Sequence, residues 1–241
     1  MALPKIDAPV YELELPLSKK QIRFRPFLVK EQKNLMMAME ADDKDTIERN
    51  IKQVLHNCTL TEGVDIEKLP IVDVEYYFIQ LRARSVGELV ENTYVCNNMV
   101  DGVECGNKMK TTLNLLDVNV TLDPNYSNKI QITDKLTIGL KYPEFSSIEK
   151  ILKKESAVEV AFQLVVDSIE YIYDGEQYYY ASESSPEELH QFIESLNAAQ
   201  FEKIEEFFEH LPKLNKKIEI KCSKCGYDHS IDVEGLESFF V

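Results

Sequence analysis

Two widely separated cysteine pairs, each followed directly by glycine, constrain this chain more than any other feature of its sequence. The first pair is Cys96 and Cys105, with eight residues between them, and the second is Cys222 and Cys225. Each pair lies between two strand-like runs, and the glycine permits the positive φ of a tight thiolate turn. Two such turns facing each other supply a tetrahedral zinc site with Zn–S bonds of about 2.3 Å. We therefore predict that these four cysteines bind one structural zinc ion.

Other interpretations of these cysteines stay open at the level of the sequence. The spacing of Cys222 and Cys225 is a specific half-site, whereas that of the first pair is long for a zinc knuckle. The four thiols could be unconnected, they could hold an iron–sulfur cluster, or His229 could replace one of them as a ligand. A thioredoxin-like redox pair is disfavoured, because such a pair opens a helix and here a hairpin follows. Four thiolates leave no open position for water, so the expected role is structural.

The composition is that of a globular protein with a strong acidic excess. The 241 residues are 44% hydrophobic and 29% charged, and the formal net charge is −15. This charge argues against a nucleic-acid binder, which needs a face rich in Lys and Arg. No apolar window is long enough for a transmembrane helix, and the N-terminal residues lack the pattern of a secretory signal. We expect folding in a reducing cytoplasm, where cysteines bind metal more often than they form disulfides.

Hydrophobic periodicity predicts an α+β fold in which helices pack with several antiparallel β-hairpins, two of them forming a zinc-ribbon-like site of four cysteines. Asp174-Gly175 is a strong hairpin signal, and Ser185-Pro186-Glu187-Glu188 is a capping box that opens a helix. Helical spacing is found in residues 29–41, 43–58, 72–87, 146–155, 157–169 and the segments that follow Ser185 and Asn197. Strand-like patterns are found in 10–16, 21–27, 88–96, 108–122, 128–132, 136–142, the runs flanking Asp174-Gly175, and the C-terminal hairpin.

No Gly/Ser-rich or Pro-rich linker divides the chain. We predict a single α+β unit over 1–241, with the alternative of two lobes, 1–125 and 126–241, joined through the metal site. Two apolar features are expected in the core. These are Cys58, which falls on the apolar face of its helix, and the Met-rich run 35–39, for which an adaptable surface that fits a partner groove is the alternative. The tyrosines of 171–180 suit either a half-buried hairpin or an interface, with equal weight.

No constellation of catalytic side chains emerges from the sequence. The four histidines are far apart, and no serine elbow, phosphate loop or HExxH motif accompanies them. Paired glutamates such as Glu187 and Glu188 are typical of solvated helix faces. We predict no catalytic residue and no cofactor other than structural zinc. A metal- or thiol-dependent enzyme that uses Cys58, or an incomplete site of three cysteines and one histidine, remains the alternative.

Several segments together resemble the baseplate hub proteins of T-even-like contractile-tailed bacteriophages. The similar segments are Ile22-Arg23-Phe24-Arg25-Pro26-Phe27 with Val29-Lys30-Glu31-Gln32-Lys33, Leu69-Pro70-Ile71-Val72-Asp73, Leu81-Arg82-Ala83-Arg84-Ser85-Val86-Gly87-Glu88 running into Tyr94-Val95-Cys96, and Phe207-Phe208 with Leu211-Pro212 before Cys222-x-x-Cys225-Gly226. The resemblance covers most of the chain. It implies a hub subunit or hub-assembly chaperone made in the host cytoplasm, and it supplies no catalytic residues.

The function predicted from these observations is that of a non-enzymatic baseplate hub protein or hub-assembly chaperone. Its partners would be phage baseplate hub or tail proteins, with no nucleic acid and no membrane, and its oligomeric state is open. It would act in the host cytoplasm during assembly, and the resemblance leaves open whether it stays in the virion baseplate. The alternatives are the metal- or thiol-dependent enzyme and a zinc-ribbon adaptor protein that touches nucleic acid.

Overall fold

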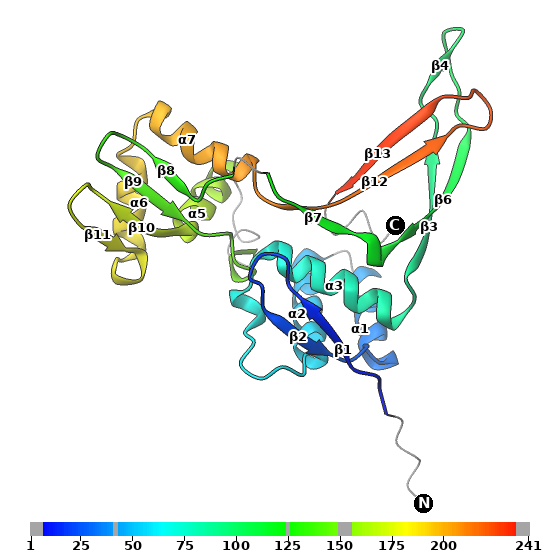
Figure 1. The fold of residues 1–241 in the computed structure, drawn as a ribbon, viewed down its shortest axis with the longest axis horizontal. Coiled ribbons are helices and arrows are strands. Elements are labelled where there is room, and N and C mark those ends of the chain that lie inside the picture. Colours follow the sequence, from blue (N-terminus) through cyan, green and yellow to red (C-terminus); the bar gives the residue numbers. More distant parts are fainter. Residues whose placement is uncertain (1–6, 41–42, 124–125, 149–155, 235–241) are drawn as a thin grey trace, which may run out of the picture.

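The computed structural model describes residues 7–40, 43–123, 126–148 and 156–234, so most of the helix predicted over 146–155 lies outside the described residues. They form a mixed arrangement of helices and small antiparallel sheets, as the periodicity predicts. Figure 1 shows a helical unit at the bottom, a lobe of sheet and helices on one side, and an arm of long hairpins on the other. Each of these parts has its own hydrophobic cluster. The division of the chain into one unit or two lobes stays a prediction.

The helical unit joins an opening hairpin to three helices around an apolar core. Phe24 and Tyr77 meet edge to face in this core, with ring centroids 5.4 Å apart. Asp43 caps the second helix by accepting a hydrogen bond from the amide of Thr46. The elements are β1 (Tyr11–Glu14), β2 (Gln21–Phe24), α1 (Val29–Glu40), α2 (Lys44–Cys58), the 3-10 turn η1 (Ile66–Lys68) and α3 (Ile71–Ser85).

A buried carboxylate ties the opening hairpin to α3. Asp73 is fully buried, and its two oxygens accept hydrogen bonds from the amides of Leu17 and Ser18, each 2.8 Å long. These amides belong to the turn between β1 and β2 that Lys19 completes with φ 57°. Charge-assisted bonds of this kind are stronger than neutral ones, so Asp73 fixes where the hairpin sits on the helix.

A second buried carboxylate organises the start of α1. Glu31 is 2% exposed and accepts hydrogen bonds from Arg25 Nη2 at 3.0 Å and from the amide of Leu28 at 2.7 Å. Burial alone would raise the pKa of Glu31, but these bonds and the nearby cations hold it below its usual value. The ion pair therefore ties the chain just after β2 to the first turn of α1.

The Met-rich part of α1 departs from the prediction. Met36, Met37 and Met39 are 56%, 57% and 52% exposed, so the expectation that they lie in the core is wrong. The described part of α1 buries only Glu31 and Ala38. A polar groove of about 600 Å³ lies between α1 and α2, and none of the three methionines lines it.

The arm consists of two long hairpins that share a core with the other side of α3. Ile79 and Ala83 of α3 pack there against Leu113 and Leu214, whereas Val74 and Phe78 face the helical unit. The strand predicted over 108–122 is interrupted by a turn that the side chain of Asn114 caps. The elements are β3 (Leu89–Val95), β4 (Met99–Val100), β5 (Val103–Glu104), β6 (Lys108–Asn114), the 3-10 turn η2 (Leu115–Asp117), β7 (Asn119–Thr121), β12 (Lys213–Lys221) and β13 (Asp228–Glu234).

The remaining lobe is a four-stranded antiparallel sheet with the order β11-β10-β9-β8. Ile138 and Ile172 on its inner face pack against Val165, Ile193 and Ile204 of the helices. The elements are β8 (Lys129–Gln131), β9 (Thr137–Leu140), α5 (Ala157–Ser168), β10 (Ile169–Tyr173), β11 (Tyr178–Tyr180), the 3-10 turn η3 (Ala181–Glu183), α6 (Pro186–Glu194) and α7 (Ala198–Glu209). The predicted capping box at Ser185 and Glu188 opens α6.

The close contact between Tyr171 and Gly139 on the outer face of this sheet should make a larger residue at position 139 destabilising. The ring of Tyr171 lies over Gly139, and a Cβ at Gly139 would come within 2.2 Å of that ring. Gly139→Ala should therefore push Tyr171 off the sheet and lower the free energy of unfolding by about 1–3 kcal/mol. Chemical denaturation measures the loss, and near-UV circular dichroism measures the change in tyrosine packing. Thr137→Ala on the same face is the control, and equal stability of the two variants would contradict the prediction.

Candidate metal centre

The four predicted cysteines lie where two hairpin ladders end at the tip of the arm. The β3–β6 ladder runs unbroken to the pair Val95 and Lys108, and the β12–β13 ladder runs to Lys221 and Asp228. A cysteine follows immediately after β3 and after β12. The two hairpins belong to different sheets, yet they lie side by side in the arm (Figure 1).

The second cysteine turn has the geometry of a knuckle. The amide of Cys222 donates to the carbonyl of Tyr227 at 2.8 Å, and the amide of Gly226 donates to the carbonyl of Cys222 at 2.9 Å. Gly226 has φ 75°, a conformation that disfavours any side chain. The glycine after the second cysteine is therefore required by the turn, as the sequence indicates.

The first cysteine turn repeats this geometry despite its longer spacing. The amide of Gly106, which has φ 64°, donates to the carbonyl of Cys96 at 2.9 Å. The residues between Cys96 and Cys105 fold into a small hairpin of their own, β4 with β5. That hairpin is closed at its base by a 2.8 Å bond from the amide of Cys105 to the carbonyl of Asn98. The insertion is thus looped out, and both cysteines occupy knuckle positions.

The two turns bring their four sulfur atoms together. All four lie within 4.8 Å of one another. Two close separations cross between the hairpins: Cys96 Sγ is 3.6 Å from Cys225 Sγ, and Cys105 Sγ is 3.8 Å from Cys222 Sγ. These distances far exceed the S–S bond of about 2.05 Å in a disulfide. The four side chains could therefore hold one metal ion.

Polar groups around the cluster donate toward the sulfurs. Asn107 Nδ2 lies 3.4 Å from Cys222 Sγ, and Asn98 Nδ2 lies 3.6 Å from Cys225 Sγ. Lys224 Nζ donates to the carbonyl of Cys105 at 2.8 Å and so adds a positive charge at the rim. Sequence reasoning missed the two asparagines, because their roles depend on how one hairpin faces the other.

The surroundings shift the thiol pKa values in opposite directions. Backbone amides of the second turn lower the pKa of Cys222 to about 6, and a backbone amide also lowers the pKa of Cys225. Burial raises the pKa of Cys96, which is fully buried. A cation among the sulfurs would favour the thiolate form of each, since the charged form gains an opposite charge.

His229 lies beside the cluster and is not one of its four members. Its Nε2 atom is 3.1 Å from Cys96 Sγ, and its ring packs against Tyr227 with centroids 4.7 Å apart. The group that gathers consists of the four cysteines. The alternative in which His229 replaces a cysteine is therefore not needed to complete a four-ligand set.

Cys58 lies in a different part of the molecule and in a different environment. It is fully buried in the helical unit, and the guanidinium of Arg25 lies 3.7 Å from its sulfur. Burial raises the pKa of the Cys58 thiol to about 11 despite that cation. Its predicted place in the core is confirmed, and the environment is the opposite of that of a reactive thiol.

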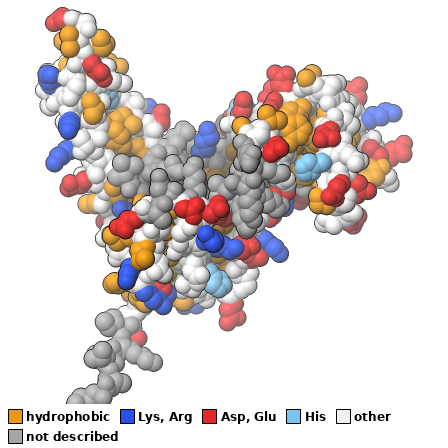
Figure 2. Space-filling view, turned by 180° about the vertical axis from the view of Figure 1, so that it is seen from behind, with side chains coloured by type: hydrophobic (Ala, Val, Ile, Leu, Met, Phe, Trp, Pro, Cys, Tyr) orange, Lys and Arg blue, Asp and Glu red, His pale blue; other side chains and the backbone are white. Residues whose placement is uncertain are grey.

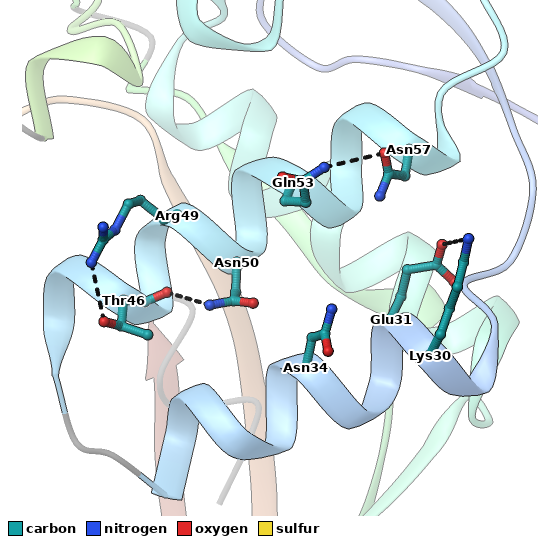
Figure 3. A pocket seen from close by; sticks show the side chains of 8 residues that line it. All are labelled: Lys30, Glu31, Asn34, Thr46, Arg49, Asn50, Gln53 and Asn57. Carbon is teal, nitrogen blue, oxygen red and sulfur yellow. Dashed lines mark hydrogen bonds and ion pairs between the residues drawn. The ribbon is translucent and has the colours of Figure 1, made fainter.

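The groove between α1 and α2 offers no comparable chemistry. Figure 3 shows side chains from both helices lining it. Its carboxylate, Glu31, is paired with Arg25, and Asn50 donates to the carbonyl of Thr46 on its own helix at 2.8 Å. Among the groove's lining residues, there is no cysteine, histidine or serine to act as a nucleophile or base. The arrangement is a solvated polar seam.

Comparison with known proteins identifies the family. Residues 8–241 match the family described as T4 bacteriophage base plate protein. The chain belongs to this family. A relative with the name baseplate hub assembly protein gp26, from Enterobacteria phage T4, is 22% identical over 231 residues. The match covers 95% of this chain and 97% of that relative, so the resemblance seen in the sequence is confirmed.

Two further comparisons complete this description. No solved structure matches the chain. None of the helices in the described part of the chain is both long and apolar enough to span a bilayer.

The environment of Cys58 predicts slow alkylation. At pH 8 a thiol with this pKa is thiolate in about one molecule in a thousand, and it is also shielded from reagent. Iodoacetamide should modify Cys58 at least about a hundredfold more slowly in the folded protein than in guanidinium chloride. Mass spectrometry of the peptide that carries Cys58 measures both rates, and similar rates would restore the case for a reactive thiol.

Proposed function

We propose that this chain is a non-enzymatic baseplate hub protein or hub-assembly factor whose arm is held together by one structural zinc ion. The observation that carries the proposal is the family match over residues 8–241. A relative of nearly equal length is named for hub assembly, which supports the same role here. The partners would then be other baseplate hub or tail proteins of the phage.

The distances between the sulfurs support zinc as the ion. Zn–S bonds of about 2.3 Å place neighbouring sulfurs about 3.8 Å apart in a tetrahedron. The two cross-hairpin separations of 3.6 and 3.8 Å fit this value. An iron–sulfur cluster inserts several irons and sulfides among the thiolates and needs wider spacing. Four thiolate ligands also leave no site for a reactive water, which favours a structural role.

The arm itself supports a mechanical role for the ion. The edges of β3 and β13 do not pair, and a groove of about 480 Å³ lined by Tyr94, Ile231 and Val233 lies between them. The shared core holds the two hairpins at their base, and the cysteine cluster joins them at their tip. The apolar cluster around Met109 at the tip is small. Zinc binding would add free energy of folding there.

The alternatives are weaker on physical grounds. The thiol-dependent enzyme would need an activated Cys58, and burial raises the pKa of that thiol. A nucleic-acid adaptor would need a basic face to neutralise phosphates, but the chain carries 42 acidic residues against 27 Lys and Arg. We propose that the protein acts in the host cytoplasm while the hub is assembled.

Loss of one cluster cysteine should remove the metal and weaken the fold together. Cys222→Ser deletes a buried ligand, and metal affinity in closed sites of this kind is folding energy on the order of 10 kcal/mol. We expect zinc below stoichiometry by elemental mass spectrometry and a melting temperature lower by about 10 °C or more. Cys58→Ser is the control, because it removes a buried cysteine but should leave the zinc content unchanged. Full metal in Cys222→Ser would refute the site.

The hub role has its own test in the phage. A phage that lacks this gene should fail to assemble complete baseplates, and the wild-type chain supplied from a plasmid should restore them. Electron microscopy of infected-cell lysates and the count of infectious particles measure the result. Normal baseplates in the absence of the gene would overturn the proposed function, whatever metal the protein holds.

A further inference from the structure

The outer face of the sheet β11-β10-β9-β8 carries four tyrosines that no described element covers. Tyr171 and Tyr173 of β10 lie opposite Tyr180 and Tyr178 of β11. Ile172 between them points inward to the core, so the four tyrosines share the outer face. Tyr178 and Tyr180 are 54% and 46% exposed. Together the four residues are called the tyrosine face below.

The rings of the tyrosine face are packed against one another before any partner arrives. Tyr173 and Tyr178 have centroids 4.6 Å apart, and Tyr171 and Tyr178 meet edge to face at 5.2 Å. Tyr171 is seated on Gly139, where a side chain would displace it. Rigid aromatic area of this kind costs little side-chain entropy on binding, and tyrosine is enriched at protein interfaces.

The lobe that carries the tyrosine face holds most of the acidic excess of the chain. Residues 126–148 and 157–212, which make up this lobe, contain fifteen Asp and Glu against four lysines and no arginine. Lys203 is engaged with the carbonyls of Gln131 and Ile132 at 3.0 and 3.1 Å. Figure 2 shows acidic side chains spread over this lobe, at the right of that view. The surface potential here is therefore negative, and it attracts cations.

A cleft opens beside the tyrosine face at Tyr180. Its volume is about 540 Å³, and Asp167, Glu170, Pro186 and Leu189 line it together with that ring. The one lysine at the cleft, Lys141, is paired with Glu144 at 2.7 Å. A ring, two carboxylates and apolar walls suit an arginine or lysine side chain, which stacks on the ring and pairs with a carboxylate.

We infer that the tyrosine face and this cleft bind a basic, arginine- or lysine-bearing segment of another baseplate hub protein. The inference rests on the proposed function for the class of partner, and on charge complementarity for its chemistry. The side chains of Tyr178 and Tyr180 would contact the segment, and Glu170 would pair with its cation. The binding would weaken with salt because exposed charges contribute to it.

Binding to peptides tests this inference directly. The probes are overlapping synthetic peptides that span the hub proteins of the same phage, titrated into the zinc-loaded full-length protein by fluorescence anisotropy. We expect a basic peptide to bind saturably, and to bind at least about tenfold more weakly to Tyr178→Ser/Tyr180→Ser and to Glu170→Arg. The controls are Met99→Ser/Val103→Ser, exposed on the arm, and Glu62→Arg, exposed on the helical unit; both should bind as the wild type does.

The other outcomes overturn the inference. These are no saturable binding, binding only of acidic or uncharged peptides, and equal binding of basic peptides to the wild type and to the face variants. Circular dichroism shows that each variant is folded, and Glu170→Arg changes only an exposed side chain. Glu170→Arg therefore tests the inference even if the tyrosine substitutions disturb the sheet.

Complementation in the phage separates this inference from the proposed function. If the phage that lacks the gene assembles normal baseplates, the proposed function fails, whatever the peptides do. If the wild-type chain restores assembly and the folded, zinc-loaded Glu170→Arg and Tyr178→Ser/Tyr180→Ser chains restore it equally well, the tyrosine face is dispensable. That result would overturn the inference while the hub role stands.

Discussion

The approach of four sulfur atoms at the tip of the arm is the contact that, together with the core on α3, relates the two long hairpins to each other. The hairpins grow from a common core on α3, but their facing strands form separate sheets with a groove between them. Two equivalent turns, each closed by a glycine with positive φ, aim the thiols at one point. Base and tip thus restrain the hairpins by different means: apolar packing at one end, and thiols that one ion can join at the other.

Helix α3 plays the corresponding part for the rest of the molecule. One side of it packs into the helical unit and the other into the base of the arm. Its buried Asp73 also holds the opening hairpin by two backbone amides. A substitution in α3 would affect the packing of both the helical unit and the base of the arm. The lobe of β8–β11 and α5–α7 has a separate hydrophobic core. The acidic charge is concentrated in that lobe, away from the thiols.

Much of this could be predicted from the sequence, because local patterns encode local structure. The capping box at Ser185, the Asp174-Gly175 turn and the cysteine-glycine turns all lie where expected. The prediction of a continuous strand through Leu115 is wrong because the side chain of Asn114 caps a 3-10 turn there. The prediction that the three methionines of α1 are buried is wrong because helical spacing does not show whether another element packs on that face of the helix. The two asparagines beside the sulfurs donate hydrogen bonds from one hairpin to cysteines of the other. Contacts between hairpins of this kind cannot be predicted from hydrophobic periodicity.

The small hairpin between Cys96 and Cys105 has a consequence for the tolerance of the arm to change. Its base is closed by the hydrogen bond from the amide of Cys105 to the carbonyl of Asn98. The amide of Gly106 still donates to the carbonyl of Cys96, as it would in a turn without the inserted residues. The length of the β4–β5 hairpin therefore does not determine where the two thiols lie. The arm should therefore tolerate a shorter or longer hairpin at this point, and an epitope or fluorophore inserted at Asp101-Gly102 should leave the cysteine turn unchanged.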